Sequence, residues 1–161
     1  SFLEQSGFEV ILTRDSDEGT DDDSTEKIAV RKKSDLKNRL GLMEKYPDAI
    51  FVSVHLNKFT TSAASGAQVF YSKNFSDESS GLAQSIQESI VYFTQPKNKR
   101  EIKPCGTSVY LIYNAVKPAV LVECGFLSNA NELKKLKDPT YQKQMAFCIF
   151  EGIIKYKLQE G

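Results

Sequence analysis

The stretch from Ala49 to Asn57, AIFVSVHLN, is the feature that most constrains how this chain folds. Its continuous β-branched and aromatic character predicts a strand buried on both faces of an α/β sheet. His55, the only histidine of the chain, lies where this strand ends. A polar residue at the carboxyl end of such a strand faces the crevice in which α/β proteins bind ligands. The spacing alone leaves two roles open for His55, a ligand-binding residue or a histidine that only ends the strand.

Size, charge and cysteine content restrict the class of protein. With 161 residues, of which 40% are hydrophobic, the chain suits one domain, residues 1–161, with a sizeable core. Basic and acidic residues balance at 21 each, which argues against nucleic acid or an anionic membrane as partner. No apolar stretch has membrane-spanning length. Cys105, Cys124 and Cys148 form no CxxC pair, so we interpret them as buried small hydrophobic residues.

The first residues, Ser1–Glu9, indicate that the natural protein continues upstream. Their sequence, SFLEQSGFE, is typical of the last turns of a helix that stops at Gly7 and leads into a strand, Phe8–Leu12. We therefore expect at least one strand and most of a helix before Ser1. Any signal peptide or anchor would lie there too.

Helical and strand patterns alternate along the rest of the chain. We expect an exposed acidic loop over Ser16–Ser24, amphipathic helices over Ile28–Tyr46, from Ser76 to Phe93 and over Thr140–Leu158, and further strands over Gly66–Tyr71, Ser108–Tyr113 and Pro118–Cys124. This order predicts a single α/β domain: a twisted, mostly parallel or mixed sheet with helices on both faces. After the last strand, Ser128 or Asn129 together with Glu132 matches a capping box.

Two segments carry charge in places that need an explanation. Glu123 ends the apolar strand Pro118–Cys124, where burial without a partner would disfavour its charged form. It is therefore either paired structurally or a general base in a crevice. The loop Gln95–Lys103 gathers four cations, and it is either a solvated surface or a contact for an acidic substrate or partner.

Several motifs together resemble one enzyme family, the zinc-dependent N-acetylmuramoyl-L-alanine amidases of the amidase-3 type. The resemblance covers nearly the whole chain, with gaps at variable loops, and looks closest to the sporulation-associated CwlD group of spore-forming bacteria. The matching motifs are LTRD (Leu12–Asp15), LKNRLGLM (Leu36–Met43), FVSVHLN (Phe51–Asn57), GAQVFY (Gly66–Tyr71) and PAVLVECGFLSNANE (Pro118–Glu132).

The resemblance implies a catalytic zinc ion held by two histidines and a glutamate, with a further glutamate as acid/base. Matched motif by motif, His55 takes the role of a metal ligand and Glu123 that of the catalytic glutamate. Asn57 either orients His55, touches substrate or caps the strand end. The other ligands belong to a Gly-His-Gly-Gly segment and a glutamate that precede LTRD, and this chain contains neither. One ligand cannot hold catalytic zinc, so the chain alone is expected to be inactive.

The function implied by the family is hydrolysis of the amide between N-acetylmuramic acid and L-alanine of peptidoglycan stem peptides. Such an enzyme works outside the cytoplasm, in the cell wall or spore cortex of a bacterium, during sporulation, germination or wall remodelling. Its partners would be peptidoglycan and, where the metal site needs completion, an activator protein. The alternative is a non-catalytic wall-binding or regulatory module with an amidase fold.

Overall fold

The computed structural model describes residues 1–14 and 28–160, so the predicted acidic loop Ser16–Ser24 lies outside the described residues. The elements are α1 (Phe2–Gln5), α2 (Ile28–Glu44), β1 (Phe51–Asn57), β2 (Gln68–Tyr71), α3 (Ser76–Phe93), β3 (Lys103–Pro104), α4 (Tyr110–Tyr113), β4 (Ala119–Phe126), α5 (Ala130–Leu136) and α6 (Pro139–Glu160).

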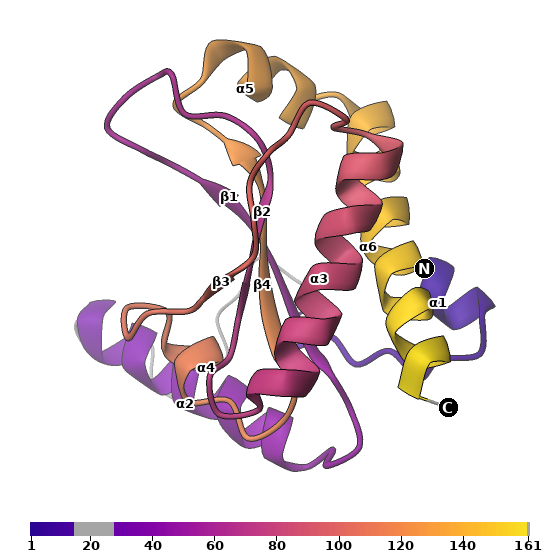
Figure 1. The fold of residues 1–161 in the computed structure, drawn as a ribbon. Coiled ribbons are helices and arrows are strands. Elements are labelled where there is room, and N and C mark those ends of the chain that lie inside the picture. The colour runs from indigo at the N-terminus through magenta and orange to yellow at the C-terminus, as the bar shows by residue number, and fades with distance from the viewer. Residues whose placement is uncertain (15–27, 161) are drawn as a thin grey trace.

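The four strands form one mixed sheet in the order β1-β4-β2-β3. β1 runs parallel to β4, β2 runs antiparallel to β4, and β3 runs parallel to β2. Helices α3 and α6 cover one face of the sheet, whereas α2 and α4 lie on the other (Figure 1). The predicted single α/β layer structure with helices on both faces is therefore confirmed.

A separate apolar core fills each side of the sheet. On the α3/α6 side, strand residues such as Val120 and Val122 pack with Ile86 and Ile153, and these four side chains are at most 2% exposed. On the other side, Met43 and further side chains from α2, α4 and β4 form a smaller core. β4 pairs with β1 on one edge and β2 on the other, and all of its residues except Glu123 are buried, so the prediction of a buried strand over Pro118–Cys124 is confirmed.

The prediction that Ala49–Asn57 is buried on both faces is wrong, although the strand itself exists as β1. Within the described residues β1 pairs with β4 on one side only, so it is an edge strand. Val54 and Leu56 are accordingly 59% and 46% exposed. The described neighbours of β1 therefore leave part of its apolar surface exposed.

Two further strand predictions are also wrong. Residues Phe8–Leu12 are extended but join no ladder, and Phe8 instead packs against the larger core. The run Ser108–Tyr113 contains the short helix α4, whose Leu111 and Ile112 are buried. Short apolar runs do not distinguish a strand from a buried helical turn, and here the turn geometry prevails. A short strand, β3, also lies where only a loop is predicted.

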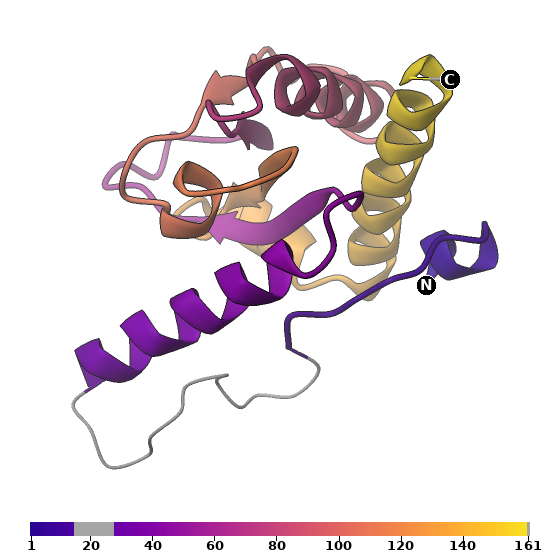
Figure 2. The same cartoon turned by 90° about the horizontal axis from the view of Figure 1, so that it is seen from below.

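The helix predictions hold with local adjustments. Gly7 ends α1 with a positive φ of +86°, as its C-terminal position predicts, whereas Ser1 begins the helix through a capping box with Glu4. Helix α2 contacts the sheet side near Met43, and its first turns project away from the sheet (Figure 2). The three cysteines are buried and free, as expected.

Candidate functional site

His55 and Glu123 lie side by side on neighbouring strands. They are register partners in the parallel pairing of β1 with β4, where adjacent strands are about 4.8 Å apart. Side chains alternate between the faces of a sheet, and Phe51 of β1 and Leu121 of β4 belong to the smaller core. His55 and Glu123 therefore project on the same face as that core. His55 lies four residues after Phe51, and Glu123 lies two residues after Leu121, in each case nearer to the carboxyl end of the strand.

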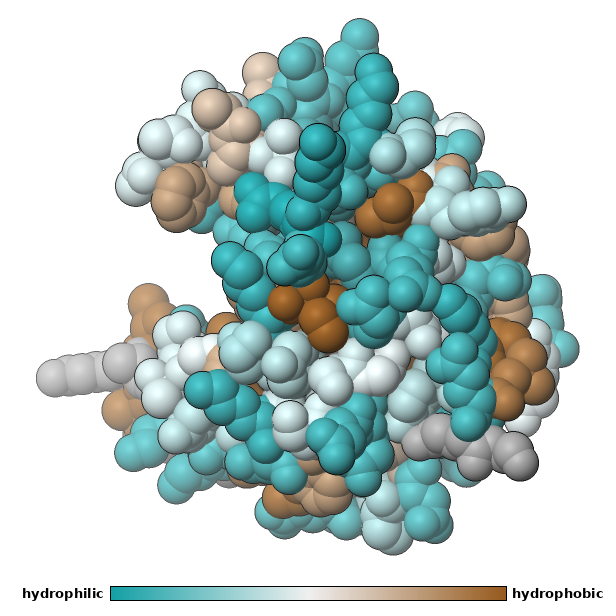
Figure 3. All heavy atoms as spheres, in the orientation of Figure 1, coloured by the Kyte–Doolittle hydropathy of each residue, from teal (hydrophilic) through white to brown (hydrophobic). Residues whose placement is uncertain are grey.

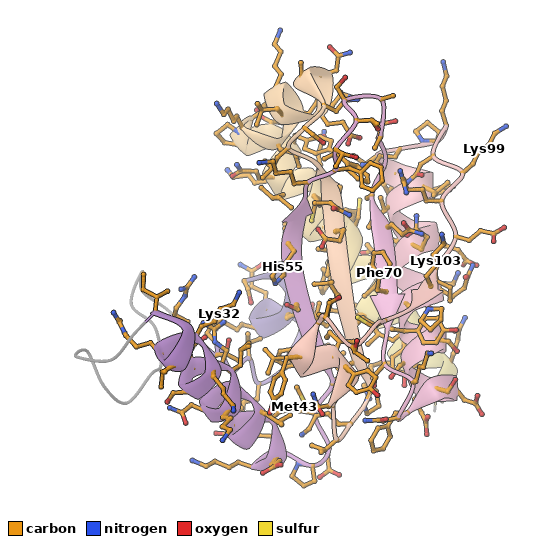
Figure 4. All side chains as sticks on the ribbon, turned by 90° about the vertical axis from the view of Figure 1, so that its left-hand side faces the viewer. Lys32, Met43, His55, Phe70, Lys99 and Lys103 are labelled. Atoms are coloured by element: carbon orange, nitrogen blue, oxygen red, sulfur yellow. The ribbon has the colours of Figure 1, made fainter. Side chains whose placement is uncertain are left out.

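This face of the sheet is open above the smaller core. The space-filling view is hollowed on its left side, between the α5 end of the molecule and α2 (Figure 3). Figure 4 looks onto the same side and shows His55 on β1, with Met43 below it and Lys32 to the lower left on the projecting helix α2. His55 therefore lies on the open side of the sheet, and its role in binding a ligand stays a prediction.

The surroundings of His55 favour its neutral form. The side chain remains partly exposed to solvent. Its partial loss of hydration lowers the pKa of His55, and the nearby positive charge of Arg39 lowers it further. Arg39 itself is held in an ion pair with Asp35 at 3.0 Å between Nη2 and Oδ2. Neutral imidazole is the form that binds metal ions, so His55 is suited to be a ligand at neutral pH.

Glu123 is a partly buried carboxyl group without a described partner. Its Oε2 atom is buried and makes no hydrogen bond within residues 1–14 and 28–160. Burial raises the pKa of Glu123. The pKa of the Cys105 thiol is also raised, first by its own burial and then by the negative charge of Glu123. A carboxyl group with a raised pKa and an unused oxygen is the arrangement expected of a general base, not of a structural ion pair.

Gln68 completes the row of polar residues across the sheet, and the sequence analysis did not single it out. It opposes Glu123 in the β2–β4 pairing and is only 5% exposed. Its amide donates to the carbonyl oxygen of Glu101 at 2.8 Å and accepts from Arg100 Nη1 at 3.1 Å. Arg100 also stacks on the ring of Phe126, 4.7 Å from its centroid. The sequence QVFY of β2 does not alternate between polar and apolar residues, so no local signal placed Gln68 on this face.

The rim above the site is held by the carboxylate of Glu132. Its two oxygens accept from the backbone N–H groups of Gly66 and Phe126, each at 2.7 Å. The predicted N-cap at Asn129 is confirmed, because its side chain accepts from the N–H groups of Asn131 and Glu132. The reciprocal half of the predicted capping box is wrong, because the Glu132 carboxylate reaches to the loop before β2 instead. Gly66 has a φ of +89°, so this loop position favours glycine. Glu132 thus joins the loop to the end of β4.

The loop between β1 and β2 is further tied to the start of α5. Asn129 Nδ2 donates to the carbonyl oxygen of Ser62 at 2.9 Å, and the N–H of Phe59 donates to Ser128 Oγ at 3.2 Å. Asn57 lies at the same end, where its carbonyl oxygen accepts from Leu127 N–H at 2.8 Å. The Asn57 backbone therefore helps to close the strand end, and the role of its side chain stays a prediction.

The described residues do not form a complete metal site. Within residues 1–14 and 28–160, no three His, Cys, Asp or Glu side chains come together closely enough to hold a metal ion. His55 and Glu123 offer one imidazole and one carboxylate, whereas catalytic zinc requires three protein ligands. His55 therefore fits zinc as a single ligand, and the described part of the chain does not supply the set. The same residues contain no helix long and apolar enough to cross a membrane.

Comparison with known proteins relates this chain to one group of enzymes. The family model described as N-acetylmuramoyl-L-alanine amidase matches residues 1–155. A Bacillus subtilis (strain 168) protein named germination-specific N-acetylmuramoyl-L-alanine amidase is 33% identical over 99% of the chain, which spans 66% of that relative's length. The whole relative is thus longer than the chain described.

Solved structures show the same relationship. The CwlD amidase from Clostridioides difficile, solved in complex with the GerS lipoprotein, is 40% identical with a TM-score of 0.91, over 96% of this chain and 78% of that one. The catalytic domain of CwlV, an amidase from Bacillus (Paenibacillus) polymyxa var. colistinus, is 28% identical with a TM-score of 0.73, over 96% and 76%. The chain therefore shares its fold with solved amidases.

Proposed function

Since the chain belongs to the N-acetylmuramoyl-L-alanine amidase family, we propose that residues 1–161 are the part of a catalytic domain that carries its acid/base residue. The reaction is hydrolysis of the amide between N-acetylmuramic acid and the L-alanine of a peptidoglycan stem peptide. The observation that supports it most is the pairing of His55 with Glu123 on one open face. Similarity to a germination-specific relative favours spore peptidoglycan as the natural substrate.

Glu123 is the general base and general acid of this reaction. Its carboxylate accepts a proton from the attacking water, and the protonated carboxyl then donates this proton to the leaving amine of alanine. The raised pKa of Glu123 serves the second step, because it makes the protonated carboxyl more persistent near neutral pH. Glu123 lies on β4 between β1 and β2, where its side chain is half-buried.

His55 is one ligand of a zinc ion whose other ligands come from outside the described residues. When bound, zinc would supply Lewis acidity that polarises the scissile carbonyl and acidifies water. The chain's own contribution is a neutral imidazole, which its lowered pKa maintains at neutral pH. For Asn57, two residues further on, the proposed roles are contact with substrate, orientation of His55 or capping of the strand end.

The cellular setting follows from the relatives. The substrate lies in the wall or spore cortex, so we place the protein outside the cytoplasm. One solved relative is titled as a complex with a lipoprotein. Because this relative is 40% identical to the chain, we include an activator protein in the proposal.

The experiment is zinc analysis combined with product analysis on muropeptides, with the protein supplied with the upstream sequence and any activator. The proposal predicts stoichiometric zinc and a released stem peptide with a free L-alanine amino group. A metal-loaded protein that binds peptidoglycan and releases no peptide would contradict the enzymatic role. That outcome would favour the non-catalytic wall-binding module instead.

A further inference from the structure

The cations of the loop Gln95–Lys103 differ in what they contact. Arg100 is used within the fold, where it donates to the Ser65 carbonyl oxygen at 2.6 Å and to Gln68 and stacks on Phe126. Lys103 is exposed, and no ion pair or hydrogen bond of its side chain occurs within the described ranges. The loop therefore combines a structural arginine with a lysine that is available to a ligand.

Sheet register places Lys103 on the same face as the candidate site. Lys103 of β3 is the parallel partner of Phe70 in β2, and Phe70 in turn opposes Leu121 of β4. Phe70 and Leu121 both belong to the core on the His55 side, so the Lys103 side chain starts on that face. Figure 4 shows His55, Phe70 and Lys103 across the side of the sheet turned toward the viewer.

The distance from Glu123 to Lys103 matches a short peptide. Two strand spacings across the sheet and two residues along it separate the Cα atoms by about 12 Å. Three extended peptide residues span about 10 Å. Between the two positions lies β2, with Gln68 opposite Glu123 and the half-buried Phe70 ring beside Lys103, and this ring is the apolar floor. Glu101, the acidic residue nearest to Lys103 in sequence, lines a pocket with α3 on the opposite side of the sheet.

We propose that Lys103 is a specificity-determining residue that binds a carboxylate of the stem peptide one or two residues beyond the alanine. The inference rests on the proposed hydrolysis, because it places the cleaved amide beside Glu123. The peptide then runs from Glu123 across β2 to β3, over the apolar floor. Lysine suits this role because its ammonium group ends a flexible stem and can follow a carboxylate.

Lys32 is the competing cation on this side of the molecule. It lies on the first turns of α2, which project away from the sheet (Figure 2), whereas Lys103 is fixed by β3 in the row beside Phe70. A peptide held by Lys32 would leave the apolar floor of the sheet uncovered. The two positions can be separated by substitution because both lysines are exposed.

The test measures binding, so it does not depend on turnover. The probes are a synthetic acidic tripeptide that begins with L-alanine and the same tripeptide with its carboxylates amidated. We expect the natural sequence to bind the acidic probe about three- to fivefold more tightly, the range of an exposed charge pair. Lys103→Gln should abolish this preference and Lys103→Arg should keep it. Lys97→Gln, at an exposed position of the same loop, should also keep it.

Three results would overturn the role of Lys103: an intact preference in Lys103→Gln, loss of the preference in Lys32→Gln instead, or equal binding of both probes by the natural sequence. Hydrolysis assays on the matched muropeptides separate this inference from the proposed function. A charge preference that depends on Lys103 without hydrolysis would contradict only the enzymatic role. Hydrolysis without the preference would contradict only the role of Lys103.

Discussion

His55 and Glu123 are register partners on the parallel strands β1 and β4, and both project on the face that bears α2 and α4. The two residues are 68 positions apart in the chain, as their numbers show. Each has a pKa displaced by loss of hydration, downward for the imidazole and upward for the carboxyl group. Both shifts favour the uncharged form, which suits a metal ligand and a proton donor.

The pH dependence of stability should reveal the burial of Glu123. A carboxyl group whose pKa is raised by folding binds its proton more tightly in the folded state. The contribution of Glu123 to the free energy of unfolding is therefore fully present below the pKa of an ordinary glutamate. This contribution is lost as pH rises through the raised pKa of the folded state. Glu123→Gln removes this loss, so the variant should be more stable than the natural sequence at pH 7, by an amount that shrinks at pH 4. Urea unfolding at pH 4 and pH 7 checks this, and an equal difference at both pH values would contradict it.

Removal of the Glu132 carboxylate should loosen the rim of the site. Glu132→Gln replaces one of two charged acceptors by an amide N–H₂ that faces a backbone N–H, and we expect a loss of about 2 kcal/mol in unfolding free energy. Glu9→Gln, at an exposed position, should change it by less than about 0.5 kcal/mol. Hydrogen exchange at Gly66 should accelerate in Glu132→Gln. Unchanged protection at Gly66 would show that the contact is unimportant.

Two glycines provide a matched test of the α3–α6 contact. A Cβ atom on Gly152 would lie 2.5 Å from the Ile86 Cα atom, whereas a Cβ atom on Gly41 meets nothing within 4 Å. Gly152→Ala should destabilise the fold by about 1–3 kcal/mol because backbone must move. Gly41→Ala should stabilise it by up to about 1 kcal/mol through helix propensity. Thermal unfolding of both variants decides, and a stable Gly152→Ala variant would refute the close helix packing.

Lys117 is a buried lysine that the site does not use. It is 3% exposed, its ammonium group has no hydrogen bond within the described residues, and burial lowers its pKa despite the opposing charge of Asp48. A lysine whose pKa is lowered by folding costs stability while the unfolded chain is protonated, and this cost fades as pH rises toward the unfolded pKa. Lys117→Met should therefore raise the unfolding free energy at pH 7 by about 1 kcal/mol. The gain should shrink near pH 10, and a variant less stable than the natural sequence at pH 7 would contradict this account.

Much of the architecture was predictable because long patterns carry it. The helices α3 and α6 have apolar stripes over many turns, and the strand around Val120 and Val122 is apolar throughout. Short segments were less predictable, because the run that became α4 has too few residues to show a period. The two-sided burial expected of β1 failed because composition does not reveal how many strands lie beside it.

The site was predictable as residue types and less so as contacts. His55 and Glu123 each end an apolar strand, and motifs shared with a family placed them in one site. The contacts of the Glu132 side chain were misjudged because its spacing from Asn129 matches a local capping box. The groups that it contacts belong instead to Gly66, in the loop before β2, and to Phe126, at the end of β4. Gln68 was missed because its position depends on which strand pairs with β4.

The central claim is that Glu123 moves the proton beside a metal held in part by His55. The most direct measurement is single-turnover release of stem peptide from a defined muropeptide, with zinc content determined on the same samples. We predict that Glu123→Gln retains zinc and slows release at least about 100-fold, whereas His55→Ala also loses zinc. Release by Glu123→Gln at the rate of the natural sequence, with zinc present, would contradict the account.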